Sequence, residues 1–393
     1  MLNINNNTDI GVIGAGTMGS GIAQVAASAG HAVYLYDANF SSCEKAIVNL
    51  KNGLNKLVDK GKLEQKKADS IISNIHIIDK LENFQKCGLI IEAIIEDLDV
   101  KRTLFGKLED ICEPTCIFAS NTSSLSIGSI SGNLKNPERF AGLHFFNPAQ
   151  VLPLVEVVPS VLTSDNIING LYDLMKVWGK TPVIAKDTPG FIVNKVARPY
   201  YGEALKIYEE GLADFSEIDF AMKSIGSFKM GPFELMDLIG NDVNYKVTET
   251  VFTEFYYDGR YKPSITQKRY AEAGLLGRKS GRGFYDYSKE TTFEEKNYDY
   301  NKLNYIFTRI LVMLINEAID TLYRNIASKE DIDLAVIKGV NYPKGLLKWA
   351  DELGLEFVYD ELNSLYTLYL EDRYRPCPLL KKMIDSSKKF YNE

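Results

Sequence analysis

The sequence from Asp9 to Gly19 reads D-I-G-V-I-G-A-G-T-M-G and decides how the first third of the chain folds. Its first half is a β-branched run typical of a buried strand, and small residues at helical spacing follow it. The next apolar run, H-A-V-Y-L-Y-D, ends on the acid Asp37. A G-x-G-x-x-G pattern is weak evidence alone and can be a turn without a ligand. Between a strand and a helix, with an acid about 20 residues further on, it predicts a dinucleotide-binding βαβ unit.

The glycines of this loop have separate physical roles. Gly14 permits the tight turn, Gly16 lets the backbone approach a pyrophosphate, and Gly19 lets the helix pack close to the strand. Free N–H groups at the start of the helix then face the phosphates. Asp37 would accept hydrogen bonds from the adenosine ribose and repel a 2′-phosphate, which favours NAD over NADP. The predicted cofactor contacts in this segment are Gly14, Gly16, Thr17, Met18, Gly19 and Asp37.

Apolar runs and helical spacing keep alternating after this unit. Strand-like runs occupy residues 88–93 and 115–120, and a last one lies at Thr181–Ile184. The alternation predicts an α/β Rossmann-type domain over residues 1–186, with a parallel sheet and helices on both faces. In such a sheet the ligand crevice lies at the carboxyl ends of the strands. The residues that follow these ends are Glu96, Asn121, Thr122 and Ser123.

Some residues of this domain have a structural interpretation that is as good as a functional one. Ser123 is as well placed to be the N-cap of the following helix as to line a site. Residues 41–73 carry helical spacing and several lysines, most of which fit a solvated helix face. Among them, Lys56 and Lys60 are the candidates for contacts with the phosphates of a large anionic substrate.

The stretch from Arg139 to Val158 holds two further apolar runs, R-F-A-G-L-H-F-F and L-V-E-V-V, each with one ionisable group. His144 lies in the first run and Glu156 in the second, and Asn147 with the following proline predicts a turn between them. A histidine between strands is more often a satisfied core residue than a catalytic one. The preceding dinucleotide site favours the catalytic interpretation here.

Several motifs occur together in order: G-A-G-T-M-G, E-A-I-I-E-D-L-D-V-K, S-N-T-S-S-L, H-F-F-N-P, L-V-E-V-V and K-D-T-P-G-F-I-V-N. Over residues 9–287 this combination resembles the L-3-hydroxyacyl-CoA dehydrogenase family, which includes 3-hydroxybutyryl-CoA dehydrogenases. The resemblance implies an NAD-dependent enzyme of fatty-acid metabolism that interconverts L-3-hydroxyacyl-CoA and 3-oxoacyl-CoA, with 3-hydroxybutyryl-CoA and acetoacetyl-CoA as the expected pair. It implies His144 as the catalytic base, Glu156 as its partner, and Ser123 and Asn194 in the active site near the substrate. The family's cofactor contacts fall on Glu96, Lys101, Ser123, Asn147 and Lys279.

The chemistry of these residue types agrees with the implied roles. Oxidation of a secondary alcohol requires a base for the hydroxyl proton while hydride leaves the same carbon, and a neutral imidazole suits that task. A carboxylate on the other ring nitrogen would fix the tautomer and stabilise the imidazolium. Two alternatives stay open: a related hydroxyacid or sugar-acid dehydrogenase, and a non-catalytic nucleotide-binding protein. The presence of His144, Glu156, Ser123 and Asn194 together speaks against the second.

The remainder of the chain is predicted to be helical and to contain an internal repeat. The first helical domain covers residues 187–287, where Pro199 should kink the first helix. A shift of 114 residues aligns this domain with residues 300–388, for example Asp219 with Asp333. The second copy has Thr308 where the first has Asn194, so we interpret it as a degenerate, structural copy. The polar stretch 287–300 reads as a linker. A homodimer is possible, although the second copy could replace part of the dimer contact.

Composition bounds the remaining possibilities. The 393 residues suggest two or three domains, and the net charge of −7 argues against a nucleic-acid surface. No apolar run reaches membrane-spanning length, and five cysteines without a C-x-x-C pair fit reduced thiols in a cytoplasmic protein. The three histidines are far apart, so no metal site is predicted. His31 is expected at the surface beside a turn, and His76 has no assigned role.

Overall fold

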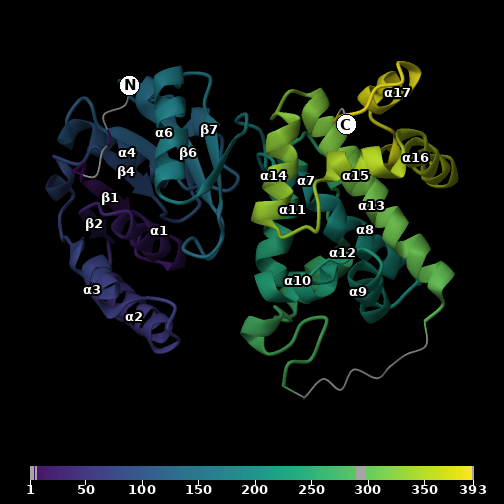
Figure 1. Cartoon of the computed structure of the whole chain (residues 1–393), viewed down its shortest axis with the longest axis horizontal. Coiled ribbons are helices and arrows are strands. Elements are labelled where there is room, and N and C mark those ends of the chain that lie inside the picture. Colours follow the sequence, from purple (N-terminus) through teal and green to yellow (C-terminus); the bar gives the residue numbers. More distant parts are fainter. Residues whose placement is uncertain (1–3, 5–6, 289–297, 392–393) are drawn as a thin grey trace. The chain divides into compact units, whose positions relative to one another are not determined.

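The computed structural model describes residue 4, residues 7–288 and residues 298–391, and these residues form two compact units (Figure 1). The first unit comprises residues 1–188, close to the predicted boundary after residue 186, and the second comprises residues 189–393. The first is an α/β domain and the second is helical, which confirms the predicted fold class. Both predicted helical domains lie within the second unit.

A single sheet of eight strands organises the described part of the first unit, in the order β3-β2-β1-β4-β5-β6-β7-β8. Neighbouring strands pair in parallel except β6 and β7, which pair antiparallel. The predicted parallel sheet is therefore extended by a strand pair of opposite direction at one side. The strands are β1 (Ile10–Ile13), β2 (Val33–Tyr36), β3 (Ile75–Ile77), β4 (Leu89–Glu92), β5 (Ile117–Ser120), β6 (Phe140–Phe145), β7 (Leu154–Pro159) and β8 (Thr181–Ile184).

Helices connect these strands and cover the sheet. One apolar cluster contains side chains of β1, β2, β4 and β5 together with residues of the helices, so it forms the main core of the unit. Helix α1 contributes small residues such as Ala23 and Ala26, which let it approach the strands closely. The helices are α1 (Thr17–Ser28), α2 (Phe40–Asp59), α3 (Gln65–Ser73), η1 (Leu81–Phe84), α4 (Leu98–Ile111), α5 (Ile127–Ser131), η2 (Pro137–Arg139) and α6 (Asp165–Val177).

His31 is buried, so its predicted surface position is wrong. Its exposed fraction is 1%, and its Nδ1 lies 2.9 Å from the carbonyl oxygen of Thr8. The indole N–H of Trp178 donates to its Nε2 over 3.0 Å. Trp178 ends α6, 147 positions further along the chain. The turn next to His31 suggested solvent, but a distant aromatic residue covers the ring.

The second unit consists of helices with short connections. The first predicted helix is interrupted at Ala197, between α7 and α8, where Pro199 occupies the first turn of α8. Proline lacks the N–H that a continuous helix would use there, so the predicted kink is present as a break. The helices are α7 (Val193–Val196), α8 (Arg198–Glu209), α9 (Phe215–Ser224), α10 (Pro232–Ile239), α11 (Asn241–Glu254), η3 (Gly259–Tyr261), α12 (Ile265–Glu272), η4 (Arg278–Ser280), α13 (Tyr300–Tyr323), α14 (Lys329–Gly339), α15 (Leu346–Leu353), α16 (Leu355–Tyr369), η5 (Asp372–Tyr374) and α17 (Pro378–Asp385).

A helix-capping contact occurs twice in this unit. Asp219 accepts hydrogen bonds from the backbone N–H groups of Phe233 and Glu234 at the start of α10, over 2.8 and 2.9 Å. Asp333, which aligns with Asp219 in the predicted repeat, accepts two equivalent bonds at the start of α15, over 2.8 and 3.0 Å. Each carboxylate thus satisfies N–H groups that have no partner inside their own helix.

Buried ion pairs link the two halves of the second unit reciprocally. The ammonium of Lys195 in α7 donates to Glu317 in α13, and the guanidinium of Arg309 in α13 donates to Glu203 in α8 over 2.6 Å. Lys195 aligns with Arg309, and Glu203 aligns with Glu317, under the same shift of 114 residues. Each half therefore supplies one cation and one carboxylate to the ion pairs with the other half.

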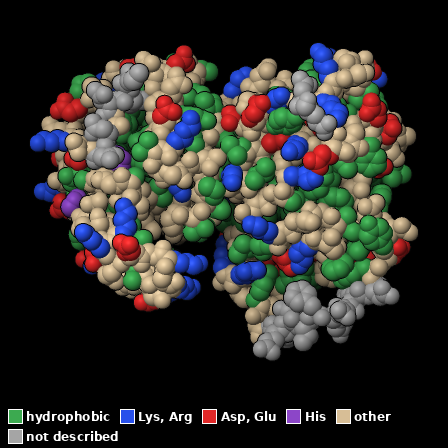
Figure 2. Space-filling view, viewed as in Figure 1, with side chains coloured by type: hydrophobic (Ala, Val, Ile, Leu, Met, Phe, Trp, Pro, Cys, Tyr) green, Lys and Arg blue, Asp and Glu red, His purple; other side chains and the backbone are tan. Residues whose placement is uncertain are grey.

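The molecular surface carries both kinds of charge. Figure 2 shows Lys and Arg side chains lying beside Asp and Glu side chains over the visible face of each unit. Within the described ranges, no helix has the length and apolar character needed to cross a bilayer. The predicted linker at 287–300 falls mostly on residues 289–297, which lie outside the described residues.

Candidate active site

The glycine loop between β1 and α1 has the shape that a dinucleotide requires. Gly14 has a φ of +100°, and a Cβ at this position would lie 2.5 Å from the carbonyl oxygen of Ala93, so only glycine fits. Gly16 is exposed, and a Cβ there would meet no atom within 4 Å, which leaves its backbone open to a ligand. Thr17 begins α1 and is exposed, and Met18 is half-buried. The start of α1 carries no side-chain cap, so its N–H groups suit the pyrophosphate of NAD.

Asp37 follows β2 and is bonded to the same loop. Its Oδ2 accepts a hydrogen bond from the backbone N–H of Ala15 over 2.8 Å, and its Oδ1 accepts one from that of Asn39 over 2.9 Å. These bonds fix the carboxylate beside the glycine loop, where its remaining lone pairs suit the ribose hydroxyls of NAD. The residues present therefore fit this cofactor.

Replacing Asp37 with serine should weaken NADH binding by about tenfold or more, because a hydrogen bond to a charged group contributes ~1.5–3 kcal/mol. NADPH should bind no more weakly than before, because the negative charge that repels its 2′-phosphate is removed. Fluorescence titration of both nucleotides measures the two affinities. Asp59→Ser, which changes an exposed acid of α2, is the matched control. An unchanged ratio of the two affinities would contradict the assignment of Asp37.

The loop after β5, residues 121–126, is held by the carboxylate of Glu96. Glu96 Oε1 accepts hydrogen bonds from Thr122 Oγ1 over 2.6 Å, from the N–H of Ser123 over 3.0 Å and from the N–H of Ser124 over 3.2 Å. Burial by itself raises the pKa of Glu96, but Lys101 and these hydrogen bonds outweigh it, and the net pKa is lowered. Glu96 therefore organises the loop that carries Ser123.

Ser123 is not the N-cap of the following helix, so the structural alternative for this residue is wrong. The cap of α5 is Ser126, whose side chain accepts the N–H of Ser129. Asp187 adds two more bonds, from the N–H groups of Ile127 and Gly128, over 2.9 and 2.8 Å. Two residues, Ser124 and Leu125, separate Ser123 from this cap, because the chain makes one further turn before the helix begins. Ser123 is half-buried in that turn.

Lys101 lies beneath this loop, between two carboxylates. Its side chain is 1% exposed, and its Nζ lies 2.5 Å from Glu92 Oε1 and 3.3 Å from Glu96 Oε2. Burial raises the pKa of Glu92 despite these partners, and Ser120 Oγ donates to the same carboxylate over 2.6 Å. The structure thus gives Lys101 a supporting position, and its contact with the cofactor stays a prediction. Sequence reasoning missed Glu92. Its position at the end of an apolar run, nine residues before Lys101, could have indicated a buried ion pair.

His144 and Glu156 face each other across the antiparallel pair β6 and β7. They are directly opposite in the register, and His144 Nδ1 lies 2.7 Å from Glu156 Oε2. Both side chains are buried, with side-chain exposed fractions of 8% and 0%. Because a carboxylate only accepts hydrogen bonds, the hydrogen of this contact belongs on Nδ1, which places the lone pair of the imidazole on Nε2. The predicted hairpin does bring both groups to one place.

Two further side chains bond the backbone on either side of the turn between β6 and β7. Asn121 Oδ1 accepts the backbone N–H of Phe145 over 2.8 Å. Lys180 Nζ donates to the carbonyl oxygens of Ala149 and Leu152, over 2.5 and 2.9 Å, and burial lowers the pKa of Lys180 to about 8. Between these anchors Asn147 is exposed, and its peptide bond to the next proline is cis. Sequence reasoning missed Lys180, since no local pattern links it to the hairpin.

The remaining predicted site residues belong to α2 of the first unit and to α7 and η4 of the second. Lys56 and Lys60 are exposed at the end of α2. Asn194 is half-buried in α7 of the second unit, and the exposed Lys279 of η4 lies 2.6 Å from a carboxylate oxygen of Asp242. Because each unit is described by itself, the site roles of Asn194 and Lys279 stay predictions. Within the residues that the structure describes, no group of three or more His, Cys, Asp or Glu could hold a metal ion.

Comparisons with known proteins agree with this geometry. The family model described as "3-hydroxyacyl-CoA dehydrogenase, NAD binding domain" matches residues 9–188, and the model of the "C-terminal domain" of that family matches residues 190–287 and 305–390. A "3-hydroxyadipyl-CoA dehydrogenase" of Escherichia coli is 36% identical, over 96% of this chain and 97% of that protein. A "3-hydroxybutyryl-CoA dehydrogenase" of Clostridioides difficile is 41% identical, over 71% of this chain and 99% of its own length.

A solved structure resembles the whole chain. The crystal structure of a "3-hydroxybutyryl-CoA dehydrogenase" from Escherichia coli has a TM-score of 0.92 at 36% identity, and the match covers 98% of this chain and 100% of that one. The glycine loop, the NAD-binding model and the full-length relatives agree. The chain belongs to the 3-hydroxyacyl-CoA dehydrogenase family of NAD-dependent oxidoreductases.

Proposed function

We propose that this protein interconverts a short-chain L-3-hydroxyacyl-CoA and the corresponding 3-oxoacyl-CoA, with His144 as the general base and Glu156 as the residue that orients it. The observation that carries the proposal is the hydrogen bond of 2.7 Å between His144 Nδ1 and Glu156 Oε2 on adjacent strands. It leaves Nε2, the basic nitrogen, on the side of the ring away from the carboxylate, and we assign Nε2 the removal of the hydroxyl proton.

The proposed oxidation removes a proton from the hydroxyl oxygen and a hydride from the carbon that carries it. His144 Nε2 takes the hydroxyl proton as the carbonyl bond forms, and Glu156 stabilises the resulting imidazolium. Bound NAD supplies the acceptor for the hydride. In the reverse direction the imidazolium returns its proton to the carbonyl oxygen. Phe146, whose ring centroid lies 4.5 Å from that of His144, shields the imidazole from water on one side.

The loop at Ser123 is proposed to hold the substrate oxygens. Glu96 accepts a hydrogen bond from the backbone N–H of Ser123 over 3.0 Å, and its Oε1 lies 3.5 Å from the Ser123 hydroxyl oxygen. Glu96 therefore fixes the loop that carries this hydroxyl. We assign Asn194 the same task from the second unit. Both groups bond oxygen atoms without competing for the proton that His144 takes.

Two acyl groups are candidates for the substrate. The C. difficile relative is named for 3-hydroxybutyryl-CoA, whereas the full-length E. coli relative is named for 3-hydroxyadipyl-CoA. The solved full-length structure from E. coli is titled a 3-hydroxybutyryl-CoA dehydrogenase, so the shared length of the chains does not separate the two candidates. The two substrates differ at the far end of the acyl chain, where the adipyl group carries a carboxylate.

The test follows NADH absorbance with acetoacetyl-CoA, with 3-oxoadipyl-CoA and with free acetoacetate. We expect rapid oxidation of NADH with at least one thioester and little with the free acid. The ratio of kcat/KM for the two thioesters assigns the acyl group. Turnover of the free acid alone would replace this proposal with a hydroxyacid dehydrogenase. No turnover of any of the three would favour a nucleotide-binding protein without this activity.

We further propose that residues 300–388 are a second, degenerate copy of the helical domain at residues 187–287. Support comes from the repeated capping by Asp219 and Asp333 and from the reciprocal ion pairs of Lys195 and Arg309. The second copy has Thr308 in place of Asn194, so its role is structural. It provides the first copy with a packing partner inside the same chain, which lessens the need for a second subunit there.

A further inference from the structure

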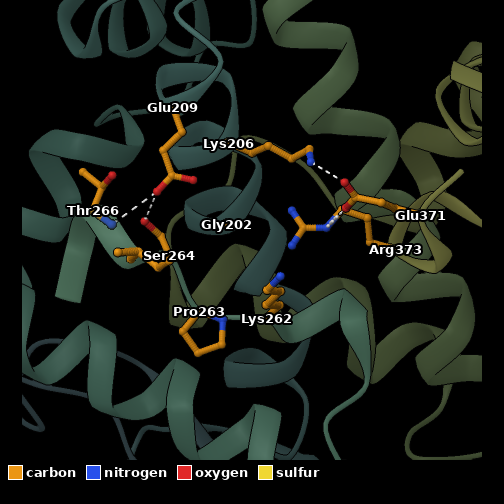
Figure 3. A pocket seen from close by; sticks show the side chains of 10 residues that line it. Gly202, Lys206, Glu209, Lys262, Pro263, Ser264, Thr266, Glu371 and Arg373 are labelled. Atoms are coloured by element: carbon orange, nitrogen blue, oxygen red, sulfur yellow. Dashed lines mark hydrogen bonds and ion pairs between the residues drawn. The ribbon is translucent and has the colours of Figure 1, made fainter. Parts of the chain in front are cut away.

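A cavity of about 330 Å³ lies within the second unit, beside α8. Its walls come from α8, from the segment that leads into α12, and from η5 (Figure 3). None of the residues assigned above to the dehydrogenase site lines it. The lining residues that matter here are Gly202, Lys206, Glu209, Lys262, Glu371 and Arg373.

Charged side chains of both signs line this cavity. Glu209 is occupied by Ser264 Oγ, which donates over 2.5 Å, and by the N–H of Thr266 over 3.3 Å. Glu371 is shared by two cations, because Lys206 Nζ lies 2.6 Å and Arg373 Nε 3.3 Å from its carboxylate oxygens, and Figure 3 shows both converging on it. The exposed lysine of the lining adds a third cation. Two of the three cations thus lie on Glu371, and the carboxylates of Glu210 and Glu203 lie further away, 3.8 Å from Lys206 and 3.7 Å from Arg373.

Arg373 is the least satisfied of these cations. Its side chain is 10% exposed, and its buried Nε donates no hydrogen bond, since Glu371 lies out of line. A second carboxylate, that of Glu203, is 3.7 Å from its Nη1. A buried guanidinium normally uses its N–H groups in hydrogen bonds, and an unmade bond is costly. A ligand in the adjacent cavity could supply the missing hydrogen-bond acceptor for the Nε–H of Arg373.

The other half of the second unit contains an equivalent arginine that has carboxylate partners. The sequence R-Y-K-P at residues 260–263 recurs as R-Y-R-P at 373–376, and Tyr261 and Tyr374 both donate to a glutamate of the opposite half. The first arginine, Arg260, lies 2.7 Å from Asp258 and 3.1 Å from Asp320. It therefore has a carboxylate on each side.

Two sequence differences between the halves distinguish the surroundings of Arg373 from those of Arg260. The position that aligns with Asp320 is Lys206, so the repeat has a cation at the position whose acid pairs with Arg260. The position that aligns with Gly202 is Asn316, which donates to the carbonyl oxygen of Arg375 over 3.0 Å and fills its side of the fold. Gly202 leaves the space open, and a Cβ there would meet no atom within 4 Å. The missing acid and the missing side chain coincide in one cavity.

We propose that this cavity is a binding site for a small oxyanion, the phosphate or carboxylate group of a metabolite, held by Arg373, Lys206 and Lys262. Arginine recognises such groups through paired N–H donors, and lysine adds charge. The volume is at the lower end of the range for small-molecule sites, so a compact ligand is expected. The ligand would take the place that the carboxylate of Asp320 occupies beside Arg260.

The proposal is tested by titrating the full-length protein with inorganic phosphate and, separately, with succinate, at constant ionic strength. Calorimetry and the thermal unfolding midpoint are the readouts. We expect saturable binding of at least one anion and a midpoint that rises with its concentration as mass action requires. The tighter of the two anions assigns phosphate or carboxylate chemistry. Sodium chloride at matched ionic strength reports the general salt effect.

Two variants locate the binding. Gly202→Asn copies the residue that fills the other half, and Lys206→Asp copies the acid that satisfies the other arginine. Each should weaken anion binding by about tenfold or more, the equivalent of ~1.5–3 kcal/mol for a hydrogen bond to a charged group. Lys338→Asp makes the same charge change at an exposed position of α14 and should bind like the wild type.

Several results would overturn the proposal. One is wild-type protein that shows no saturable response to either anion. Another is a response of equal strength in Gly202→Asn and wild type, which would mean an adventitious ion only. The wild-type titration decides the question even if a variant does not fold.

Discussion

His144→Ala is expected to lower kcat by about 10²- to 10⁴-fold, the usual contribution of a positioned general base. The affinity for NADH should stay close to that of the wild type, because the glycine loop and Asp37 are unchanged. Initial rates with the better thioester measure the first effect, and fluorescence titration of NADH measures the second. Loss of both together would indicate a structural role for His144.

Two further variants sharpen this result. His76→Ala removes an exposed imidazole from β3 and should leave turnover unchanged, which controls for the substitution itself. Glu156→Gln keeps a polar side chain opposite His144 but removes the charge that stabilises the imidazolium, so kcat should fall while NADH still binds. Turnover of His144→Ala within about tenfold of wild type would contradict its role as the base.

Lys195→Met is expected to destabilise the second unit by about 3–5 kcal/mol, the cost of removing one member of a buried ion pair. The Lys195 side chain is 0% exposed, and its ammonium donates to Glu317, to Asp320 over 3.0 Å and to Thr321 over 3.0 Å. Without it, two carboxylates stay buried with fewer partners. Urea unfolding monitored by circular dichroism gives the free energy of unfolding.

The controls for this prediction come from the same unit. Arg309→Met removes the aligned cation, which bonds Glu203 over 2.6 Å, and should cost a similar amount. Lys381→Met removes an exposed cation 2.5 Å from Asp385, and such surface pairs contribute little to stability. A loss for Lys195→Met no larger than that for Lys381→Met would show that the buried pair does not stabilise the fold.

The parts of the site that sequence could predict depend on short-range rules. The turn at Gly14 requires a positive φ that only glycine adopts easily, and the acid at Asp37 ends the very next strand. His144 and Glu156 are 12 positions apart on two apolar runs joined by a turn, so their pairing follows from one hairpin. In each case the pattern and the contact lie within one supersecondary unit.

The parts that escaped prediction depend on contacts between distant segments. His31 is covered by a tryptophan 147 positions away, and nothing near His31 indicates that cover. The expected contact of Lys101 with the cofactor stays a prediction, whereas its ion pair with the buried carboxylate of Glu92 was not foreseen. Ser126, rather than Ser123, caps α5, because both serines fit a cap by composition and only the path of the chain distinguishes them.

The reciprocal ion pairs of the second unit have a consequence for the ancestry of the chain. Lys195 and Glu203 belong to the first half. Lys195 pairs with the residue that aligns with Glu203, and Glu203 pairs with the residue that aligns with Lys195. A polypeptide that carried only the first half would therefore bear a self-complementary face, on which the lysine of one molecule could reach the glutamate of another. Duplication within one gene would then have converted a contact that depends on protein concentration into one that does not, and it would have freed the second half to lose its share of the chemistry.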